Sequence, residues 1–165
     1  MPTDIDRIID NVITNEGGAK ATDDPSDNGG RTQYGISEKS NPQAWLDGQV
    51  SEQEAKEIYL RKYVVWPGFH KLPVSHQKLQ AQLIDYGVHS GPQLAIQKLQ
   101  AILGAKTDGV LGPKTLNAIE QTDPVALNNK LMQARVKMIG NIVSKNPSQL
   151  KYLNGFLSRA LDFMV

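Results

Sequence analysis

Residues 5–18 read IDRIIDNVITNEGG, and this stretch sets the expected start of the fold. Its apolar residues recur three and four positions apart, the spacing of an amphipathic helix: Ile5, Ile8, Ile9, Val12 and Ile13. Two glycines follow, which signals the end of a helix. The helix is therefore expected to end at Glu16, where the helix dipole disfavours a negative charge. Because helix stability does not explain a glutamate there, Glu16 is a candidate functional residue.

The segment that follows is rich in Asp, Gly, Ser, Asn, Thr and Pro, so residues 19–33 are expected to form a loop. Thr32 to Ser37 include β-forming side chains and are expected to form a short strand. A hairpin at Gly29-Gly30 would turn this segment back toward Glu16. A small β-hairpin element is therefore expected near residues 30–37.

Hydrolysis of a glycosidic bond requires two groups that this hairpin would bring together. One is an acid beside the leaving oxygen, and the other activates water or attacks the sugar directly. The candidates are Glu16, a second carboxylate from Asp23, Asp24 or Asp27, and the hydroxyl of Thr32. The alternative is that the aspartates cap turns in a glycine-rich loop and that Glu16 is a surface residue.

The rest of the chain predicts helices. Ser51 to Glu54 form a capping-box pattern that opens a helix through Tyr63. Further helical patterns are followed by glycine and proline breaks, and they cover residues 79–88, 94–103, 115–120, 125–143 and 150–164. The expected fold is a mainly α helical bundle that carries the small hairpin.

Composition narrows the function classes. The chain has 165 residues with 39% hydrophobic and 21% charged side chains, which is typical of a globular protein. It has no cysteine, which excludes disulfides and thiolate chemistry, and its histidines show no zinc-ligand spacing. We therefore expect no metal and no cofactor. Charges interrupt the early apolar residues, so we expect no signal peptide and no stable membrane insertion.

Charge is distributed unevenly along the chain. Residues 1–57 hold 12 acidic and 5 basic side chains, a net charge of −7, whereas residues 58–165 hold 5 acidic and 13 basic ones, a net of +8. A basic half favours contact with an anionic surface such as a cell wall, a membrane or a nucleic acid. The alternative, a solvated helical surface, fits the scattered positions of the basic residues better. We therefore expect no nucleic-acid partner.

Two segments carry a resemblance to a known family. Asn15-Glu16-Gly17-Gly18 and residues 24–37, which read DPSDNGGRTQYGIS, closely resemble the signature of glycoside hydrolase family 108. The resemblance implies an α+β, lysozyme-like fold and an N-acetylmuramidase, which cleaves the β-1,4 bond from N-acetylmuramic acid to N-acetylglucosamine in peptidoglycan. It implies that Glu16 is the general acid and that Asp27 and Thr32 position or activate water.

The loop after Glu16 leaves the second carboxylate open. Ala19 stands where the family commonly has an aromatic residue, and the loop is longer than usual. Asp23 and Asp24 are therefore alternatives to Asp27. Tyr34 is expected either to contact the sugar or to pack in the core.

A second resemblance concerns residues 83–91, which read LIDYGVHSG. His89 is a candidate substrate-binding residue, although a lone histidine more often has a structural role. Asp85 lies on an apolar helix and needs a partner if it is buried, so we expect it to form a structural hydrogen bond.

The segment from Gln97 to Leu116 resembles a peptidoglycan-binding module. We expect residues 93–165 to include this helical region as an integral part of a single lysozyme-like muramidase domain, residues 1–165. The expected partner is the peptidoglycan glycan strand, and the expected state is a monomer.

The expected function is that of a phage-type endolysin, held in the host cytoplasm until it is released to the cell wall. A prophage remnant or a secreted effector would look similar. Three rivals remain: a non-catalytic peptidoglycan-binding protein, an amidase or peptidase that cuts the stem peptide, and disruption of the envelope by the basic half. Inversion by direct attack of water is expected, with retention as the alternative.

Overall fold

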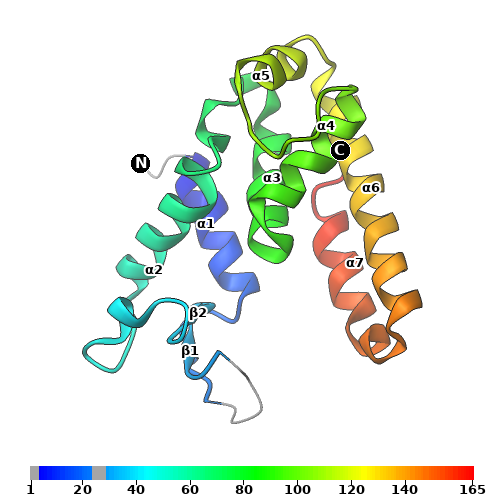
Figure 1. Ribbon diagram of the computed structural model, residues 1–165. Helices are drawn as coiled ribbons and strands as arrows, with labels where there is room; N and C mark the ends of the chain where they lie inside the picture. Colours follow the sequence, from blue (N-terminus) through cyan, green and yellow to red (C-terminus); the bar gives the residue numbers. More distant parts are fainter. Residues whose placement is uncertain (1–3, 24–28) are drawn as a thin grey trace. The chain divides into compact units, whose positions relative to one another are not determined.

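Helices form most of the computed structural model, which describes residues 4–23 and 29–165 (Figure 1). One small antiparallel sheet accompanies them within these residues. The expected mainly α fold with a small hairpin is confirmed. The chain divides into two compact units, Met1–Trp66 and Pro67–Val165. The single-domain expectation stays a prediction.

The first unit is built on two helices, α1 (Asp4–Asn15) and α2 (Glu52–Tyr59), which pack against each other. The apolar face of α1 is buried at Ile9, Val12 and Ile13, as its spacing predicts. The start of α2 is the expected capping box. Glu54 N–H donates to the Ser51 hydroxyl (3.2 Å), and Ser51 N–H donates to the Glu54 carboxylate (2.9 Å).

A π-helical segment, η2 (Leu60–Val65), continues α2. Its wider hydrogen-bond spacing is visible where Trp66 N–H donates to the Arg61 carbonyl at 3.0 Å, five residues back. Such segments are rare and occur frequently at functional sites. A short 3₁₀ turn, η1 (Pro42–Trp45), lies earlier in this unit.

The hairpin turns at Tyr34-Gly35, whereas a hairpin at Gly29-Gly30 and a continuous strand over residues 32–37 were expected. Both expectations are wrong. The structure has β1 (Thr32–Gln33) and β2 (Ile36–Ser37), paired antiparallel with Gln33 opposite Ile36. Tyr34 and Gly35 form a two-residue turn with φ of 53° and 74°. Positive φ at both positions is what a type I′ hairpin turn requires, and glycine at the second position makes it accessible.

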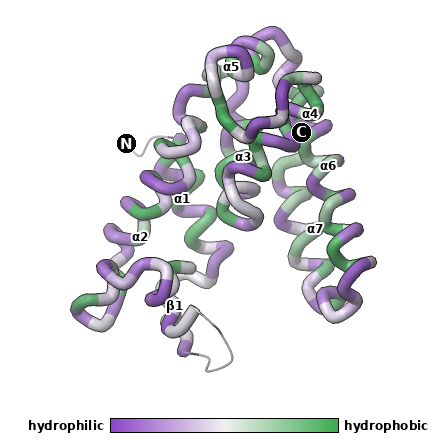
Figure 2. Tube along the Cα trace, viewed as in Figure 1, coloured by the Kyte–Doolittle hydropathy of each residue, from purple (hydrophilic) through white to green (hydrophobic). Residues whose placement is uncertain are grey.

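The second unit contains five α-helices, of which α3 (Gln77–Ser90) is central. It contacts α4 (Pro92–Leu103) and α6 (Pro124–Lys145), and α6 also contacts α7 (Leu153–Leu161). The remaining elements are α5 (Pro113–Glu120), η3 (Phe69–Lys71), η4 (Val74–His76) and η5 (Pro147–Tyr152). Hydrophobic and hydrophilic residues alternate along these helices (Figure 2), as expected for amphipathic helices. None of the described helices is long and apolar enough to cross a membrane.

A buried ion cluster ties α3 to α6 and α7. Asp85 accepts hydrogen bonds from Arg135 (2.6 Å) and Arg159 (2.8 Å), which confirms the expected structural role of this aspartate. The Arg135 guanidinium also lies over the Tyr86 and Phe163 rings, 5.0 and 5.9 Å from their centroids. Arg135 Nε and Nη1 have no hydrogen-bond acceptor among the described residues. The faces of the two rings attract the cation and so partly compensate for these missing hydrogen bonds.

The segment that resembles a peptidoglycan-binding module forms a hydrogen-bonded turn. The buried Gln100 amide donates to the Asp108 carboxylate (2.9 Å) and to the Val110 carbonyl (3.0 Å), and it accepts from Gly109 N–H (2.9 Å). Gly109 has φ of 74°, and an added Cβ would lie 2.5 Å from the Gln93 side chain. These residues therefore hold α4 to the start of α5.

Candidate active site

Glu16 is the C-cap residue of α1. Gly17 N–H donates to the Thr14 carbonyl (3.2 Å), and Gly18 N–H donates to the Ile13 carbonyl (3.0 Å). This pair of bonds defines a Schellman motif. Gly17 and Gly18 have φ of 101° and 60°, conformations that glycine adopts without steric cost. The prediction that the glycine pair ends the helix at Glu16 is thus confirmed, and the chain leaves the helix immediately beyond the half-buried Glu16.

The hairpin is bonded to the segment that follows Glu16. Tyr34 N–H donates to the Gly18 carbonyl at 2.9 Å, and the Gln33 amide donates to the Ala19 carbonyl at 3.1 Å. Thr22 and Thr32 exchange two backbone bonds of 2.8 Å. The chain therefore does return from the loop toward Glu16, as expected, and the Tyr34–Gly35 turn is the part fixed beside it.

Gly35 lies in direct contact with the stem of Glu16. An added Cβ at Gly35 would lie 2.7 Å from Glu16 Cβ and 3.1 Å from Glu16 Cγ. The same Cβ would overlap the hydroxyl of Tyr59 on α2. That hydroxyl donates to the Tyr34 carbonyl at 3.0 Å. Helix α1, the hairpin and helix α2 therefore meet at Glu16.

The pKa of Tyr63 depends on the charge of Glu16. Burial raises the pKa of the Tyr63 phenol, and the negative charge of Glu16 raises it further. The ring of Tyr63 lies 5.6 Å from that of Tyr59, centroid to centroid. The π-helical segment thus places a second phenol in the neighbourhood of the carboxyl group.

The outer side of the hairpin is braced by Arg31. Its Nε and Nη2 donate to the two oxygens of Glu38 at 3.0 and 2.8 Å, and its guanidinium lies 4.9 Å from the Trp45 ring centroid. The hydrogen bond from Arg31 lowers the pKa of the Glu38 carboxyl. Trp45 Nε1 donates to the Ile36 carbonyl at 3.2 Å. The two arms of the hairpin are therefore held in register.

The structure locates some of the residues expected from the sequence. Thr32 lies in β1, half-buried, with its hydroxyl 3.5 Å from the Gly30 carbonyl. Asp23 is exposed. Asp24 and Asp27 lie outside the described residues. The roles of Thr32 and of all three aspartates stay predictions.

Tyr34 and His89 have structural contacts of their own. Tyr34 contributes its backbone to the bonds with Gly18 and Tyr59. His89, in the second unit, packs its ring at 5.0 Å from that of Phe156, one turn from the contact between Asp85 and Arg159. A role in substrate binding stays a prediction for both.

Tyr59 and Tyr63 were not identified from the sequence. The capping box at Ser51 fixes where their helix begins, but it does not indicate which face meets Glu16. The local sequence shows only that the two tyrosines lie four positions apart within a charged stretch. This helical spacing is equally typical of residues that pack in the core.

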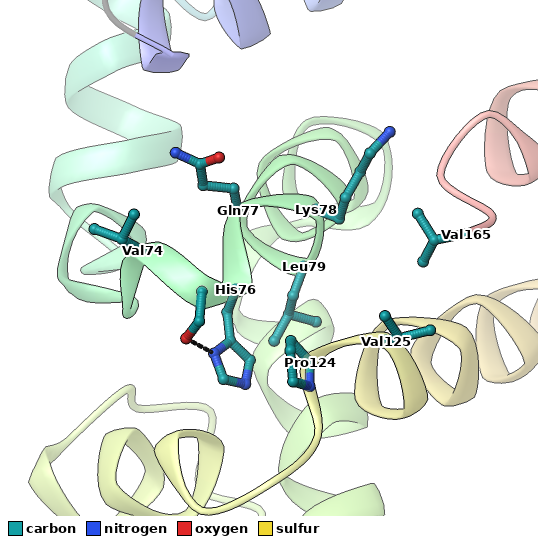
Figure 3. A pocket seen from close by; sticks show the side chains of 9 residues that line it. Val74, His76, Gln77, Lys78, Leu79, Pro124, Val125 and Val165 are labelled. Carbon is teal, nitrogen blue, oxygen red and sulfur yellow. Dashed lines mark hydrogen bonds between the residues drawn. The ribbon is translucent and has the colours of Figure 1, made fainter.

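A pocket of about 200 Å³ lies in the second unit, and no acidic residue is among those that line it (Figure 3). Val74, Val125 and Val165 line it beside His76. The His76 ring is held by the Ser75 hydroxyl (3.0 Å) and the Thr122 carbonyl (3.2 Å). Because no Asp or Glu lines it, this pocket does not supply the acid that glycoside cleavage requires. Among residues 4–23 and 29–165, no three His, Asp or Glu side chains are grouped to hold a metal ion.

Comparison with protein families identifies the class. Residues 9–91 match the model described as glycosyl hydrolase 108, and residues 94–161 match one described as a predicted peptidoglycan domain. The protein is a glycoside hydrolase of the peptidoglycan-hydrolase type. Since the first model covers half of the sequence, the chain belongs to glycosyl hydrolase family 108.

A solved structure is similar to nearly the whole chain. The structure of SagA from Brucella abortus is 29% identical, with a TM-score of 0.66, and the similarity covers 96% of this chain and 94% of that one. No curated protein matches the chain.

Proposed function

We propose that this protein is an N-acetylmuramidase that cleaves the β-1,4 bond between N-acetylmuramic acid and N-acetylglucosamine, with Glu16 as the general acid. The observation that carries the proposal is the placement of Glu16. Its backbone is fixed by the helix C-cap and its stem by Gly35, in the part of the chain that matches the hydrolase family. The side chain is half-buried, so part of it is exposed to solvent.

The chemistry requires two proton transfers and one attack by water. The Glu16 carboxyl gives its proton to the glycosidic oxygen as the bond from that oxygen to the muramic acid carbon breaks. Positive charge develops at the sugar carbon. Water then attacks that carbon from the opposite face and gives its proton to the second carboxylate.

Asp27 is the proposed second carboxylate, with Asp23 and Asp24 as alternatives, and Thr32 is proposed to orient the water. We propose inversion. A separation of about 6.5–9.5 Å between the two carboxyl groups favours inversion, whereas about 5–5.5 Å favours retention. Product stereochemistry, followed by NMR, distinguishes the two.

The test is digestion of purified peptidoglycan with the wild type, with Glu16→Gln and with Glu120→Gln. Glu120 is exposed at the end of α5, so its variant controls for the same chemical change elsewhere. Reduction with borohydride followed by mass spectrometry identifies the new reducing ends. We expect muramic acid ends from the wild type and from Glu120→Gln, and a rate lower by roughly 10²–10⁴-fold in Glu16→Gln.

Other products favour the rivals. Glucosamine ends or free stem peptides would overturn the proposed bond. Equal rates for Glu16→Gln and wild type would overturn the proposed acid. Binding to sacculi with no new ends would indicate a non-catalytic binding protein, and lysis that survives Glu16→Gln but is lost in high salt would indicate disruption of the envelope.

We also propose that the cell wall is where the enzyme acts and that cell lysis is the result, as for a phage endolysin released from the host cytoplasm. Support comes from the match of the second half to a peptidoglycan domain. Expression in a bacterial cytoplasm with and without a pore-forming protein tests this. Lysis only with the pore is expected.

A further inference from the structure

The side chain of Glu16 is confined by groups that no part of the proposed reaction uses. The Tyr59 hydroxyl and Glu16 Cβ both lie within 3 Å of one point, the position that a Cβ would take on Gly35. Both groups therefore occupy space that only a glycine leaves free. Gly35 therefore contacts both the stem of Glu16 and the Tyr59 hydroxyl, and the two contacts lie on the same side of this glycine.

Tyr59 is itself firmly placed. Its side chain is 3% exposed, on a helix whose first turn is fixed by the Ser51 capping box. Its hydroxyl donates to the Tyr34 carbonyl across 25 residues of sequence. Because the Tyr59 side chain is already held in one conformation, it loses little further conformational entropy when it orients the Tyr34–Gly35 turn.

The turn that Tyr59 holds is conformationally demanding. Tyr34 is the one non-glycine residue with positive φ in the described part of the chain. Such backbone conformations persist only where surrounding contacts enforce them, and they cluster at functional sites. Here the enforcing contacts are the bonds from Tyr34 N–H to Gly18 and from Tyr59 to the Tyr34 carbonyl.

We propose that Tyr59 is a positioning residue for Glu16: its hydrogen bond to the Tyr34 carbonyl holds the Tyr34–Gly35 turn in contact with the Glu16 stem and so fixes the direction of the carboxyl group. The inference rests on the proposed role of Glu16 as the acid. A displacement of about 1 Å at a reacting group can cost a hundredfold in rate, so a residue that holds the turn beside Glu16 has a measurable effect on the reaction.

The experiment compares Tyr59→Phe, Gly35→Ala and the double variant on soluble glycan strands of peptidoglycan. Tyr59→Phe keeps the ring and removes the bond. We expect kcat to fall about tenfold to a hundredfold with KM close to the wild-type value. Gly35→Ala introduces the overlap and is expected to lower kcat further. In the double variant the overlap with the Tyr59 hydroxyl is gone, but the new methyl group still overlaps Glu16 Cβ. Because both substitutions disturb the same contact, the two losses are expected not to add.

The control is Tyr152→Phe, which removes the hydroxyl of an exposed tyrosine in η5. Its kcat and KM are expected to match those of the wild type. Thermal unfolding shows which variants are folded. If Tyr59→Phe does not fold, Gly35→Ala, which keeps the Tyr59 hydroxyl, tests the same contact.

A second measurement does not depend on activity. The side-chain carboxyl ¹³C resonance of Glu16 is assigned as the one lost in Glu16→Gln. We expect it to shift in Tyr59→Phe and to stay unchanged in Tyr152→Phe. An unchanged resonance, a wild-type kcat, or a change in KM alone in folded Tyr59→Phe overturns the positioning role. A wild type that releases no muramic acid ends overturns the proposed function instead, and the resonance still tests the contact.

Discussion

Arg135 donates a 2.6 Å hydrogen bond to Asp85, and both side chains are 1% exposed. Because Arg159 binds the other oxygen of the same carboxylate, one buried negative charge serves two guanidinium groups. Asp85→Ala is therefore expected to destabilise the second unit strongly, by roughly 3–5 kcal/mol, since it leaves buried positive charge without a counterion. Chemical denaturation measures the change in the free energy of unfolding.

The matched control is Lys106→Ala. Its ion pair with Asp108 spans 4.0 Å with the lysine largely exposed, and such exposed pairs contribute little to stability. Equal losses in the two variants would contradict the structural role given to Asp85.

The phenol of Tyr63 is expected to ionise at lower pH in Glu16→Gln than in the wild type. The negative charge of Glu16 opposes the formation of a phenolate, and glutamine removes that charge. Burial is the larger cause of the raised pKa and is unchanged, so the pKa should stay above the ordinary value of about 10. Ultraviolet difference titration measures it, and Tyr63→Phe identifies the signal. Identical titrations with and without Glu16 would show that the two groups do not interact.

The stability of the turn at Asp108 is expected to depend on pH. The hydrogen bond from Gln100 is the main cause of a lowered pKa for the Asp108 carboxyl in the folded protein. A group with a lowered folded pKa stabilises the fold above its unfolded pKa, and this contribution disappears as pH falls through the folded value. The wild type should therefore be more stable than Asp108→Asn at neutral pH, and the difference should shrink below about pH 4. Thermal unfolding across pH tests this, and a constant difference would argue against a charged acceptor.

The second carboxylate is expected to be revealed by three single variants. Asp27→Asn should lower kcat by roughly 10²–10⁴-fold if it activates water, while Asp23→Asn and Asp24→Asn should retain most of the activity. Asp47→Asn, at an exposed position of the same unit, is the control. Loss of activity in Asp23→Asn or Asp24→Asn in place of Asp27→Asn would reassign the role.

The sequence predicts well where the signals are local. The glycine pair after Glu16 ends α1 as expected because a Schellman motif needs only residues close in the chain. The capping box at Ser51 is likewise contained within four residues. Asp85 was expected to need a partner, since an acid on an apolar helix is costly to bury.

Contacts between distant residues were not predictable in this way. The partner of Asp85 is Arg135, 50 residues further along the chain, and no local pattern selects it from the other basic residues. The split of the strand at Tyr34 was missed because tyrosine rarely adopts positive φ, and the bonds that enforce it come from Gly18 and Tyr59. The role of Tyr59 depends on the same contact between distant residues, so no local pattern in the sequence indicates it.

The paired backbone bonds between Thr22 and Thr32 have a consequence for how this enzyme can vary. They join the segment that follows Glu16 to β1 through main-chain atoms alone. Because these bonds do not depend on the identity of a side chain, Thr22 can be replaced by other residues while the chain beside Glu16 keeps its register.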